Sequence, residues 1–339
     1  YLSTFEQQRQ WLEDSPGKNA PVFLSLHVGE EFDDTYCTRA ERVCRFLTER
    51  GYRVMADVSR KTLQQFHCQE LGEIVHRLGL WAVRFDYGFS REAILEIARR
   101  MPVVLNASTI SPEEARLIGV EGREVYAMHN FYPRPETGLD RDYLMETTRL
   151  LHEAGLKVMA FIPGDTLLRG PVFEGLPTLE DHRKGLPSAA FVDLASRYGM
   201  DEIFLGDPGI SDGERERINR FCEEGVISIP AVLQEDYEHL YDRVFTCRAD
   251  SPQRLIRFRE SRTYACAGGS IPPRDCAERL RGSITIDNEN YGRYSSELQL
   301  VREYLPADPR VNVIGSVSEK GMLLAECVGR GRQFVLVRP

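Results

Sequence analysis

Short apolar runs alternate with amphipathic segments from residue 20 to about residue 233. Each run is rich in Val, Ile, Leu, Phe and Ala, which is typical of strands buried on both faces of a parallel sheet. The segments between them repeat apolar residues at i, i+3 and i+4 beside charged faces, as helices do. The predicted strands are residues 22–28, 53–59, 81–86, 103–106, 125–130, 157–163, 202–206 and 226–233, and helices are predicted at residues 38–50, 141–154 and 213–225, among others.

Strand–helix repetition of this kind gives a parallel barrel or an open doubly wound sheet. Nearly every predicted strand ends in a polar residue, whereas an open sheet concentrates such residues at one switch point. Neither GxGxxG nor GxxxxGK[ST] occurs, so no nucleotide-binding fingerprint supports the open sheet. We therefore predict a TIM-type (β/α) barrel. The polar strand ends are His27, Asp57, Asp86, Asn106, His129, Asn130, Asp165 and Asp207.

After residue 233 the pattern changes to short alternating runs, such as residues 283–287 and 334–337, separated by turn signals rich in Asp, Asn, Pro and Gly. This pattern predicts a smaller β-rich domain. We place the barrel at residues 1–236 and the second domain at residues 237–339.

Composition narrows the class of protein. The chain has 339 residues and a net charge of −9 without a long basic run, which argues against nucleic acid as a partner. No apolar run reaches a membrane-spanning length and no signal peptide is visible, so we expect a soluble, cytoplasmic protein. The eight cysteines lack CxxC spacing, which is typical of reduced thiols, and we expect neither a metal nor another cofactor.

Two carboxylates end predicted strands, Asp57 in VMADVS and Asp86 in VRFDYGF. A charge at the end of an apolar strand is costly to bury unless it faces the rim of the barrel. On adjacent strands the two carboxyl groups could stand ~5–9 Å apart, a range that covers retaining and inverting glycosidases. Alternatively, each Asp caps the following helix or pairs with an arginine, and Arg84 is only two residues from Asp86.

The loop at residues 129–138 contains His129, Asn130 and Arg134. Histidine and asparagine supply donors and acceptors for sugar hydroxyl or acetamido groups, and arginine forks onto a carboxylate or phosphate. The three prolines or glycines of this stretch leave a second interpretation open, in which it is only a loop ordered by proline.

A second loop, at residues 169–183, carries basic and acidic residues together. Arg169, His182 and Arg183 are candidates for binding an anion, and loops over a rigid rim often carry binding residues. Glu174 lies among apolar neighbours that could raise its pKa, as a general acid requires. Glu180 could instead only open the following helix.

Asp207 ends the seventh predicted strand and is followed by Pro-Gly-Ile-Ser and a helix. Backbone amides at such a helix start can hold an anion. An N-cap at Ser211 is the simpler interpretation.

At these motifs the sequence resembles the bacterial 6-phospho-N-acetylmuramidase family. The resemblance implies a TIM-type barrel with a cyclophilin-like C-terminal domain. It implies cytosolic hydrolysis, without a metal, of disaccharides of N-acetylmuramic acid 6-phosphate and N-acetylglucosamine in cell-wall sugar recycling. The matching segments are residues 25–27, 56–59, 84–89, 105–108, 129–138, 169–183, 206–208, 281–288, 291–299 and 311–315.

The sequence departs from the family pattern in a few places. The family begins with a strand that would end near Tyr1, which leaves open whether the first barrel strand is missing or truncated here. Arg60 stands where the family tends to have proline, and Ser295-Ser296 replaces a pair that contains glycine. These differences bear on substrate detail more than on fold.

We predict three catalytic residues, Glu174 as the acid and Asp86 or Asp57 as nucleophile or base. The alternative is that the two aspartates form the pair and Glu174 orders a loop by binding Arg169. The oligomeric state is open, a homodimer included. The predicted substrate-binding residues are His27, Asn106, His129, Asn130, Arg134, Arg169, Glu180, His182, Arg183, Asp207 and, from the second domain, Arg262.

Two other functions compete with the glycosidase. One is a barrel phosphosugar isomerase or aldolase, but the predicted strand ends carry no lysine for a Schiff base. The other is a non-catalytic sugar-phosphate binding protein. The acidic rim argues against it, because a pure phosphate binder has little use for carboxylates beside an anion.

Overall fold

The computed structural model describes residues 2, 4–14, 17, 19–26, 35–85, 88–262 and 270–339. The chain divides into two compact units, which are described separately below. The N-terminal unit comprises Tyr1–Arg183 with Tyr198–Gly209, and the C-terminal unit comprises Lys184–Arg197 with Ile210–Pro339.

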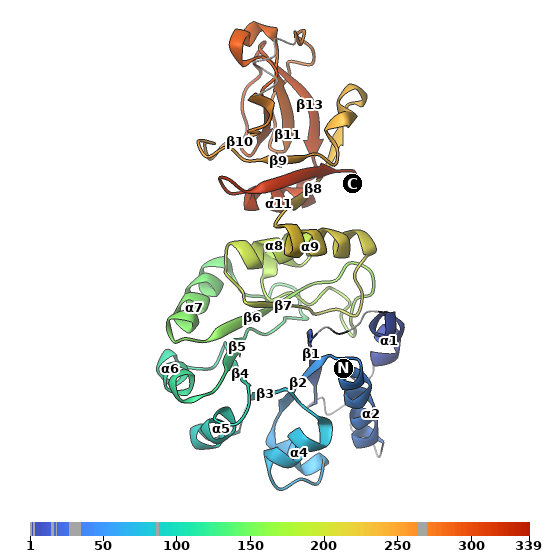
Figure 1. The fold of residues 1–339 in the computed structure, drawn as a ribbon, viewed down its shortest axis with the longest axis vertical. Helices are drawn as coiled ribbons and strands as arrows, with labels where there is room; N and C mark the ends of the chain where they lie inside the picture. The colour runs from blue at the N-terminus through green and yellow to red at the C-terminus, as the bar shows by residue number, and fades with distance from the viewer. Residues whose placement is uncertain are drawn as a thin grey trace. The chain divides into compact units, whose positions relative to one another are not determined.

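The N-terminal unit is built on a parallel sheet of seven strands that pair in chain order (Figure 1). Each of the first seven predicted strands is present, ending one to three residues earlier than predicted except at β4. The strands are β1 (Pro21–Ser25), β2 (Arg53–Val58), β3 (Ala82–Phe85), β4 (Val103–Asn106), β5 (Val125–Met128), β6 (Lys157–Ile162) and β7 (Glu202–Leu205).

Helices follow the strands and lie outside the curve of the sheet (Figure 1). Several begin where the sequence offers an oxygen for the free N–H groups of the first turn. Ser111 Oγ accepts from Glu114 N at 3.2 Å, and Asp140 Oδ1 accepts from Tyr143 N at 2.9 Å. The helices are α1 (Phe5–Asp14), α2 (Tyr36–Glu49), α3 (Arg60–Gln65), α4 (Leu71–Leu78), α5 (Arg91–Ala98), α6 (Pro112–Glu121), α7 (Arg141–Glu153) and the short η2 (Glu180–His182).

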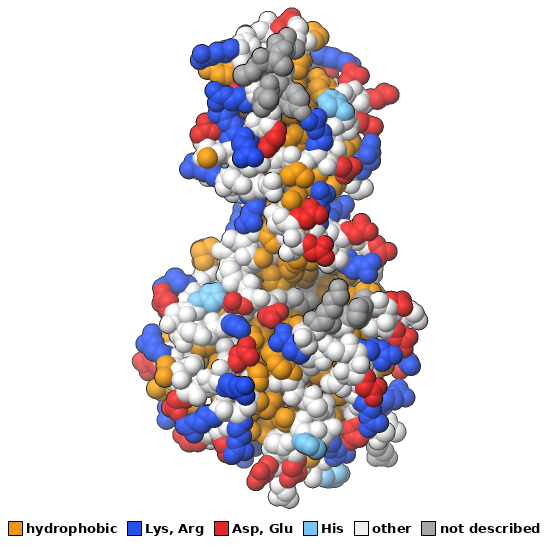
Figure 2. Space-filling view, in the orientation of Figure 1, with side chains coloured by type: hydrophobic (Ala, Val, Ile, Leu, Met, Phe, Trp, Pro, Cys, Tyr) orange, Lys and Arg blue, Asp and Glu red, His pale blue; other side chains and the backbone are white. Residues whose placement is uncertain are grey.

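The sheet curls so that its two ends approach each other. The ring of Phe23 on β1 lies 5.9 Å from the ring of Phe161 on β6, centroid to centroid. Arg53 on β2 and Glu202 on β7 form an ion pair at 3.6 Å. The inside of the curve is apolar, and Figure 2 shows hydrophobic side chains gathered in the middle of this unit with charged ones around its periphery.

The prediction of a closed barrel is wrong, because in the described part of the chain the first and last strands of this sheet are not paired with each other. β1 and β7 each have one neighbouring strand among the described residues, and both line a cavity of about 250 Å³. A barrel closes only when its first and last strands are hydrogen-bonded. The N-terminal unit is therefore an α/β half-barrel of seven strands.

The C-terminal unit contains a mixed seven-stranded sheet in the order β10-β12-β11-β13-β8-β14-β9. β14 pairs parallel to β8, and the other neighbours are antiparallel. The likeness to cyclophilin stays a prediction. The strands are β8 (Ile227–Leu233), β9 (Val244–Thr246), β10 (Leu255–Arg257), β11 (Ser283–Asp287), β12 (Leu298–Val301), β13 (Val311–Val317) and β14 (Gln333–Val337); the helices are α8 (Pro187–Ser196), α9 (Asp212–Glu224), η3 (Glu235–Leu240), η4 (Glu289–Tyr294), η5 (Glu319–Gly321) and α11 (Met322–Cys327).

The eighth predicted barrel strand belongs to this second sheet. β8 pairs through Leu233 with Gly315 and through Ile227 with Phe334. Ala189 and Val192 of α8 also belong to the core of the C-terminal unit. The domain boundary at 236/237 stays a prediction. An apolar strand has the same sequence pattern whichever sheet it joins, so the sequence alone does not assign β8.

No helix in the described ranges has the length and apolar character needed to cross a membrane. Seven of the eight cysteines lie in the described part of the chain, and all seven are free thiols. The remaining one, Cys266, lies outside it.

Candidate active site

The inner face of the half-barrel carries polar residues at the carboxyl ends of its strands. Side chains alternate along a strand, so residues two apart share a face. Met55, Ala82, Val104 and Met128 belong to the apolar cluster inside the curve. Two residues further along the chain come Asp57, Arg84 and Asn106, still on their strands, and Asn130, just after β5.

Asp57 is buried in a network that joins three strands and the segment after β5. Its Oδ1 accepts from Leu26 N at 2.6 Å, and its Oδ2 accepts from Ser25 Oγ at 3.2 Å. Arg84 lies beside it, with its nearest nitrogen 3.9 Å from Oδ2. The other end of the Arg84 guanidinium donates to Asn130 Oδ1 at 2.5 Å. The Asp57 charge is thus balanced by a neighbouring cation, as a buried charge requires.

Asn106, the last residue of β4, and His129, the first residue after β5, have different surroundings. Asn106 Oδ1 accepts from Ser108 N at 3.0 Å and so closes a turn after β4. His129 is fully buried, and its Nε2 lies 3.3 Å from Thr148 Oγ1 of α7. Burial lowers the pKa of His129 to about 4, so its ring is neutral at pH 7. The structure therefore places His129 towards the outer helices rather than with Asn130.

Asp207 anchors the long loop that follows β6. Its carboxylate accepts from the backbone N–H groups of Gly164, Arg169 and Leu176, each at 2.9 Å. The side chain is 1% exposed. Because the oxygens are occupied by main-chain donors, Asp207 shapes the loop and contributes no free acceptor there.

Glu180 clamps the two rim loops together. Arg183 donates to both of its oxygens at 2.6 Å, and the N–H groups of Glu136 and Gly138 donate at 2.9 and 2.7 Å. These bonds, with that from Arg183 the largest, lower the pKa of Glu180 to about 2. The third guanidinium nitrogen of Arg183 donates to Gly175 O at 3.0 Å. The carboxylate oxygens of Glu180 and the guanidinium nitrogens of Arg183 are thus engaged in hydrogen bonds within the protein.

Thr178 links the same two loops, and it was not among the residues predicted from the sequence. It is fully buried, donates from Oγ1 to Asn130 O at 2.9 Å and accepts from Phe161 N at 2.9 Å. Phe131 was also missed, although it directly follows Asn130. The Arg169 guanidinium carbon lies 5.2 Å from its ring centroid, within the range of a cation–π contact.

The other predicted residues of these loops are less enclosed. Arg169 and Glu174 are half-buried, and Arg134 is exposed. Glu174 lies between Phe173 and Gly175, both of which have positive φ, 57° and 83°. Such backbone turns the chain sharply on either side of the carboxylate.

Four further predicted residues complete the set. His182 is 1% exposed. Arg262 belongs to the C-terminal unit, where its side chain is exposed. His27 and Asp86 lie outside the described residues.

The described part of the chain contains no group of three or more His, Cys, Asp or Glu side chains that could hold a metal ion. The carboxylates of Glu180 and Asp207 already accept from arginine or backbone donors. These two carboxylates therefore serve hydrogen bonding in this arrangement.

A curled parallel sheet with polar side chains at its carboxyl edge defines an α/β half-barrel, and in closed barrels of parallel strands that edge is where substrates bind. Two family models match the chain, "6-phospho-N-acetylmuramidase, N-terminal" over residues 1–220 and "6-phospho-N-acetylmuramidase, C-terminal" over residues 227–337. The chain belongs to the 6-phospho-N-acetylmuramidase family, and the resemblance noted in its sequence is confirmed.

Two solved structures are similar along nearly the whole chain. A conserved Enterococcus faecalis protein of unknown function is 31% identical, with a TM-score of 0.81, over 94% of this chain and 88% of that one. An uncharacterized B. cereus protein is 21% identical, with a TM-score of 0.79, over 99% of this chain and 96% of that one, and supports the fold alone. No curated protein matches the chain.

Proposed function

We propose that this protein is a glycosidase that hydrolyses 6-phosphomuramyl disaccharides to N-acetylmuramic acid 6-phosphate and N-acetylglucosamine. The observation that carries the proposal is the match of both family models, which together span residues 1–220 and 227–337. The proposal includes a role in cell-wall sugar recycling and a cytoplasmic location, since a 6-phosphorylated sugar is produced inside the cell.

The proposed acid is Glu174, and the proposed nucleophile or base is Asp86. Glycosidases need one protonated carboxyl group for the leaving oxygen and one ionised group on the other side of the bond. Asp57 is the weaker choice for the second role, because its oxygens accept from Leu26 N and Ser25 Oγ and it lies 1% exposed beside Arg84. In this scheme Asp57 positions Arg84. The pairing of the two aspartates remains the alternative.

The proposed anion contacts are Arg169 and Arg134, which recognise the 6-phosphate and the lactyl carboxylate. Arg183 was a third candidate, but all three of its guanidinium nitrogens donate to Glu180, Gly175 or the Arg134 carbonyl. Arg262, which lies in the C-terminal unit, stays a prediction from the sequence. The side-chain amides of Asn106 and Asn130, on the inner face, suit an acetamido group or a sugar hydroxyl.

The test is incubation with a chromogenic glycoside of N-acetylmuramic acid 6-phosphate beside its unphosphorylated form. We expect release of the chromophore from the phosphorylated glycoside and little from the other. The double variant Glu174→Gln, Asp86→Asn, prepared in the same way, controls for a contaminating hydrolase. Equal turnover of both glycosides would contradict recognition of the 6-phosphate. If neither glycoside were hydrolysed, the proposed glycosidase activity would be contradicted.

A further inference from the structure

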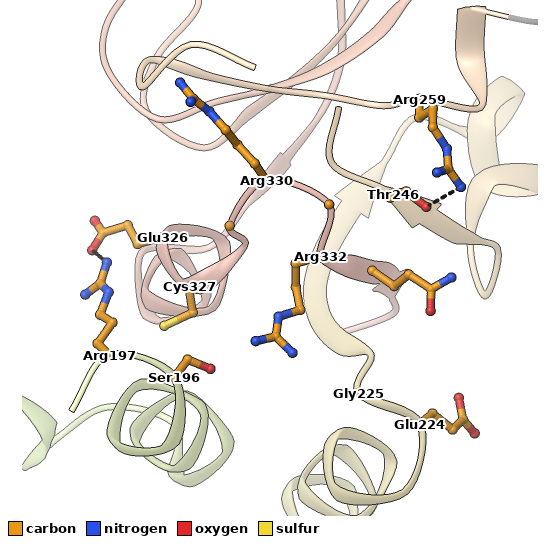
Figure 3. A pocket seen from close by; sticks show the side chains of 13 residues that line it. Ser196, Arg197, Glu224, Gly225, Thr246, Arg259, Glu326, Cys327, Arg330 and Arg332 are labelled. Atoms are coloured by element: carbon orange, nitrogen blue, oxygen red, sulfur yellow. Dashed lines mark hydrogen bonds and ion pairs between the residues drawn. The ribbon is translucent and has the colours of Figure 1, made fainter. Parts of the chain in front are cut away.

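A second cavity lies within the C-terminal unit. It has a volume of about 730 Å³, in the range of small-molecule sites, and is lined by the ends of α8 and α9, by β9 and by α11 with the turn that leads into β14. All of its lining residues belong to this one unit. Figure 3 shows this cavity from close by.

The lining carries more positive than negative charge. Four arginines face two glutamates, and both glutamates already have arginine partners. Glu326 accepts from Arg197 at 3.4 Å and from Arg281 at 2.5 Å. Glu224 accepts from Arg220 at 3.1 Å. The acidic lining residues are therefore neutralised within the protein.

Arg330 and Arg332 differ from the other two lining arginines. Arg197 and Arg259 pair with acidic residues, whereas no carboxylate in the described part of the chain lies within ion-pair distance of Arg330 or Arg332. Both are exposed. Figure 3 shows the Arg332 side chain extending into the space between α11 and the end of α9, and Arg330 leaving the same turn in another direction.

The turn that carries these two cations has the sequence Gly329-Arg330-Gly331-Arg332. It is held by Gly331 N donating to Cys247 O at 2.9 Å and Arg332 N donating to Gly329 O at 3.0 Å. A Cβ atom at Gly329 or at Gly331 would meet nothing within 4 Å. The backbone between the arginines is thus open to close approach by a ligand.

We propose that this cavity, which we call the arginine pocket and define by Arg197, Arg259, Arg330, Arg332 and the Gly329–Gly331 turn, binds a small phosphorylated ligand. Guanidinium groups match the oxygens of a phosphate in pairs, and two of those here have no internal counter-charge. The cavity size favours a small molecule, and the net charge of −9 disfavours a nucleic acid. The arginine pocket is made by residues of the C-terminal unit, whereas Glu174, Arg134 and Arg169 belong to the N-terminal unit.

The experiment is isothermal titration calorimetry, in which inorganic pyrophosphate is titrated into the protein at low ionic strength and the heat of binding is measured. We expect saturable binding that weakens at least about tenfold in the double variant R330A/R332A. The control is R254A/R338A, which removes two exposed arginines that do not line the pocket and are paired with Glu303 and Glu238. This control is expected to bind pyrophosphate like the unchanged protein.

A third variant guards against misfolding of the double variant. Gly329→Glu adds an acidic side chain where a Cβ has free space, so it should fold normally and still weaken pyrophosphate binding. The proposal is overturned if pyrophosphate does not bind, or if R254A/R338A weakens binding as much as R330A/R332A. It is also overturned if binding is lost in R134A/R169A and kept in R330A/R332A. None of these outcomes depends on whether the protein is a glycosidase.

Discussion

The nearest nitrogen of the Arg84 guanidinium lies 3.9 Å from a carboxylate oxygen of Asp57, and both side chains are almost completely buried, 6% and 2% exposed. Two buried charges are costly to remove from water and are kept where they hold a specific arrangement. Here the cation also reaches Asn130, which lies after β5. The pair thus links β2 and β3 to the loop that carries the proposed binding residues.

We predict that Asp57→Asn destabilises the protein by about 1–3 kcal/mol, because it leaves Arg84 buried beside a neutral group. Asp57→Ala should cost more, about 3–5 kcal/mol. Urea unfolding followed by tryptophan fluorescence measures both. The control is Glu49→Gln, which removes an exposed carboxylate and should change the unfolding free energy by less than about 0.5 kcal/mol. Unchanged stability of Asp57→Asn would show that the Arg84 charge needs no partner.

Glu180 makes the stability of the rim loops depend on pH. Its pKa is lowered from 4.5 to about 2 in the folded protein by Arg183 and two backbone N–H groups. The stabilisation is therefore fully present above the ordinary pKa of 4.5 and is lost as pH falls through the folded pKa. We expect a loss of at most about 2 kcal/mol between pH 5 and pH 2 from this residue, since its side chain is 29% exposed.

Glu180→Gln tests that dependence. The variant should be less stable than the unchanged protein at pH 6, and the difference should shrink towards pH 3. Urea unfolding at both pH values measures it, with Glu49→Gln as the matched Glu-to-Gln control. A stability difference that stays constant with pH would mean that the Glu180 charge contributes nothing to the clamp.

The two arginines proposed to bind the substrate anions make a kinetic prediction. Arg169→Lys and Arg134→Lys keep a positive charge and lose the planar fork that binds two oxygens at once. The KM for the phosphorylated glycoside should rise about tenfold or more, and the KM for an unphosphorylated glycoside should change little. Arg141→Lys is the control, because Arg141 is an exposed arginine paired with Asp181. Equal changes for both glycosides would contradict the assignment.

The sequence predicted seven strands of the first sheet because their apolar runs are long enough to be buried on both faces and end at polar residues. It could not predict which sheet takes β8, since Ile227–Leu233 is as apolar as the barrel strands and its partners, β13 and β14, come about 80 to 110 residues later. Strand order is a long-range property that periodicity does not contain.

The same limit applies inside the site. The strand ends identified Asp57, Asn106 and Asn130, which share the inner face with Arg84. His129 was also predicted. It directly precedes Asn130, and because side chains alternate along an extended chain it points to the opposite face, where it contacts Thr148. Glu180, Arg183 and Asp207 were predicted as binding residues because of their charge. Only the structure shows that their side chains form hydrogen bonds with backbone groups of loops distant in the sequence.

The proposed acid can be tested by changing the leaving group. Glu174 would protonate the departing oxygen of the natural disaccharide, whereas a nitrophenolate leaves without a proton. Glu174→Gln should therefore lower kcat about 10²–10⁴-fold on the disaccharide and far less on a nitrophenyl glycoside. Asp86→Asn, which removes the proposed nucleophile or base, should be poor on both substrates.

Glu136→Gln is the matched control for Glu174→Gln, since Glu136 is an exposed rim residue that takes part in the clamp through its backbone N–H. It should leave both substrates nearly unaffected. If Glu174→Gln lowers activity equally on the disaccharide and the nitrophenyl glycoside, Glu174 shapes the site rather than donating the proton. The pair would then be Asp57 and Asp86, and the leaving-group dependence should appear in Asp57→Asn instead. Because Asp57 lies beside Arg84, that variant must be compared at a temperature where urea unfolding shows it to be fully folded.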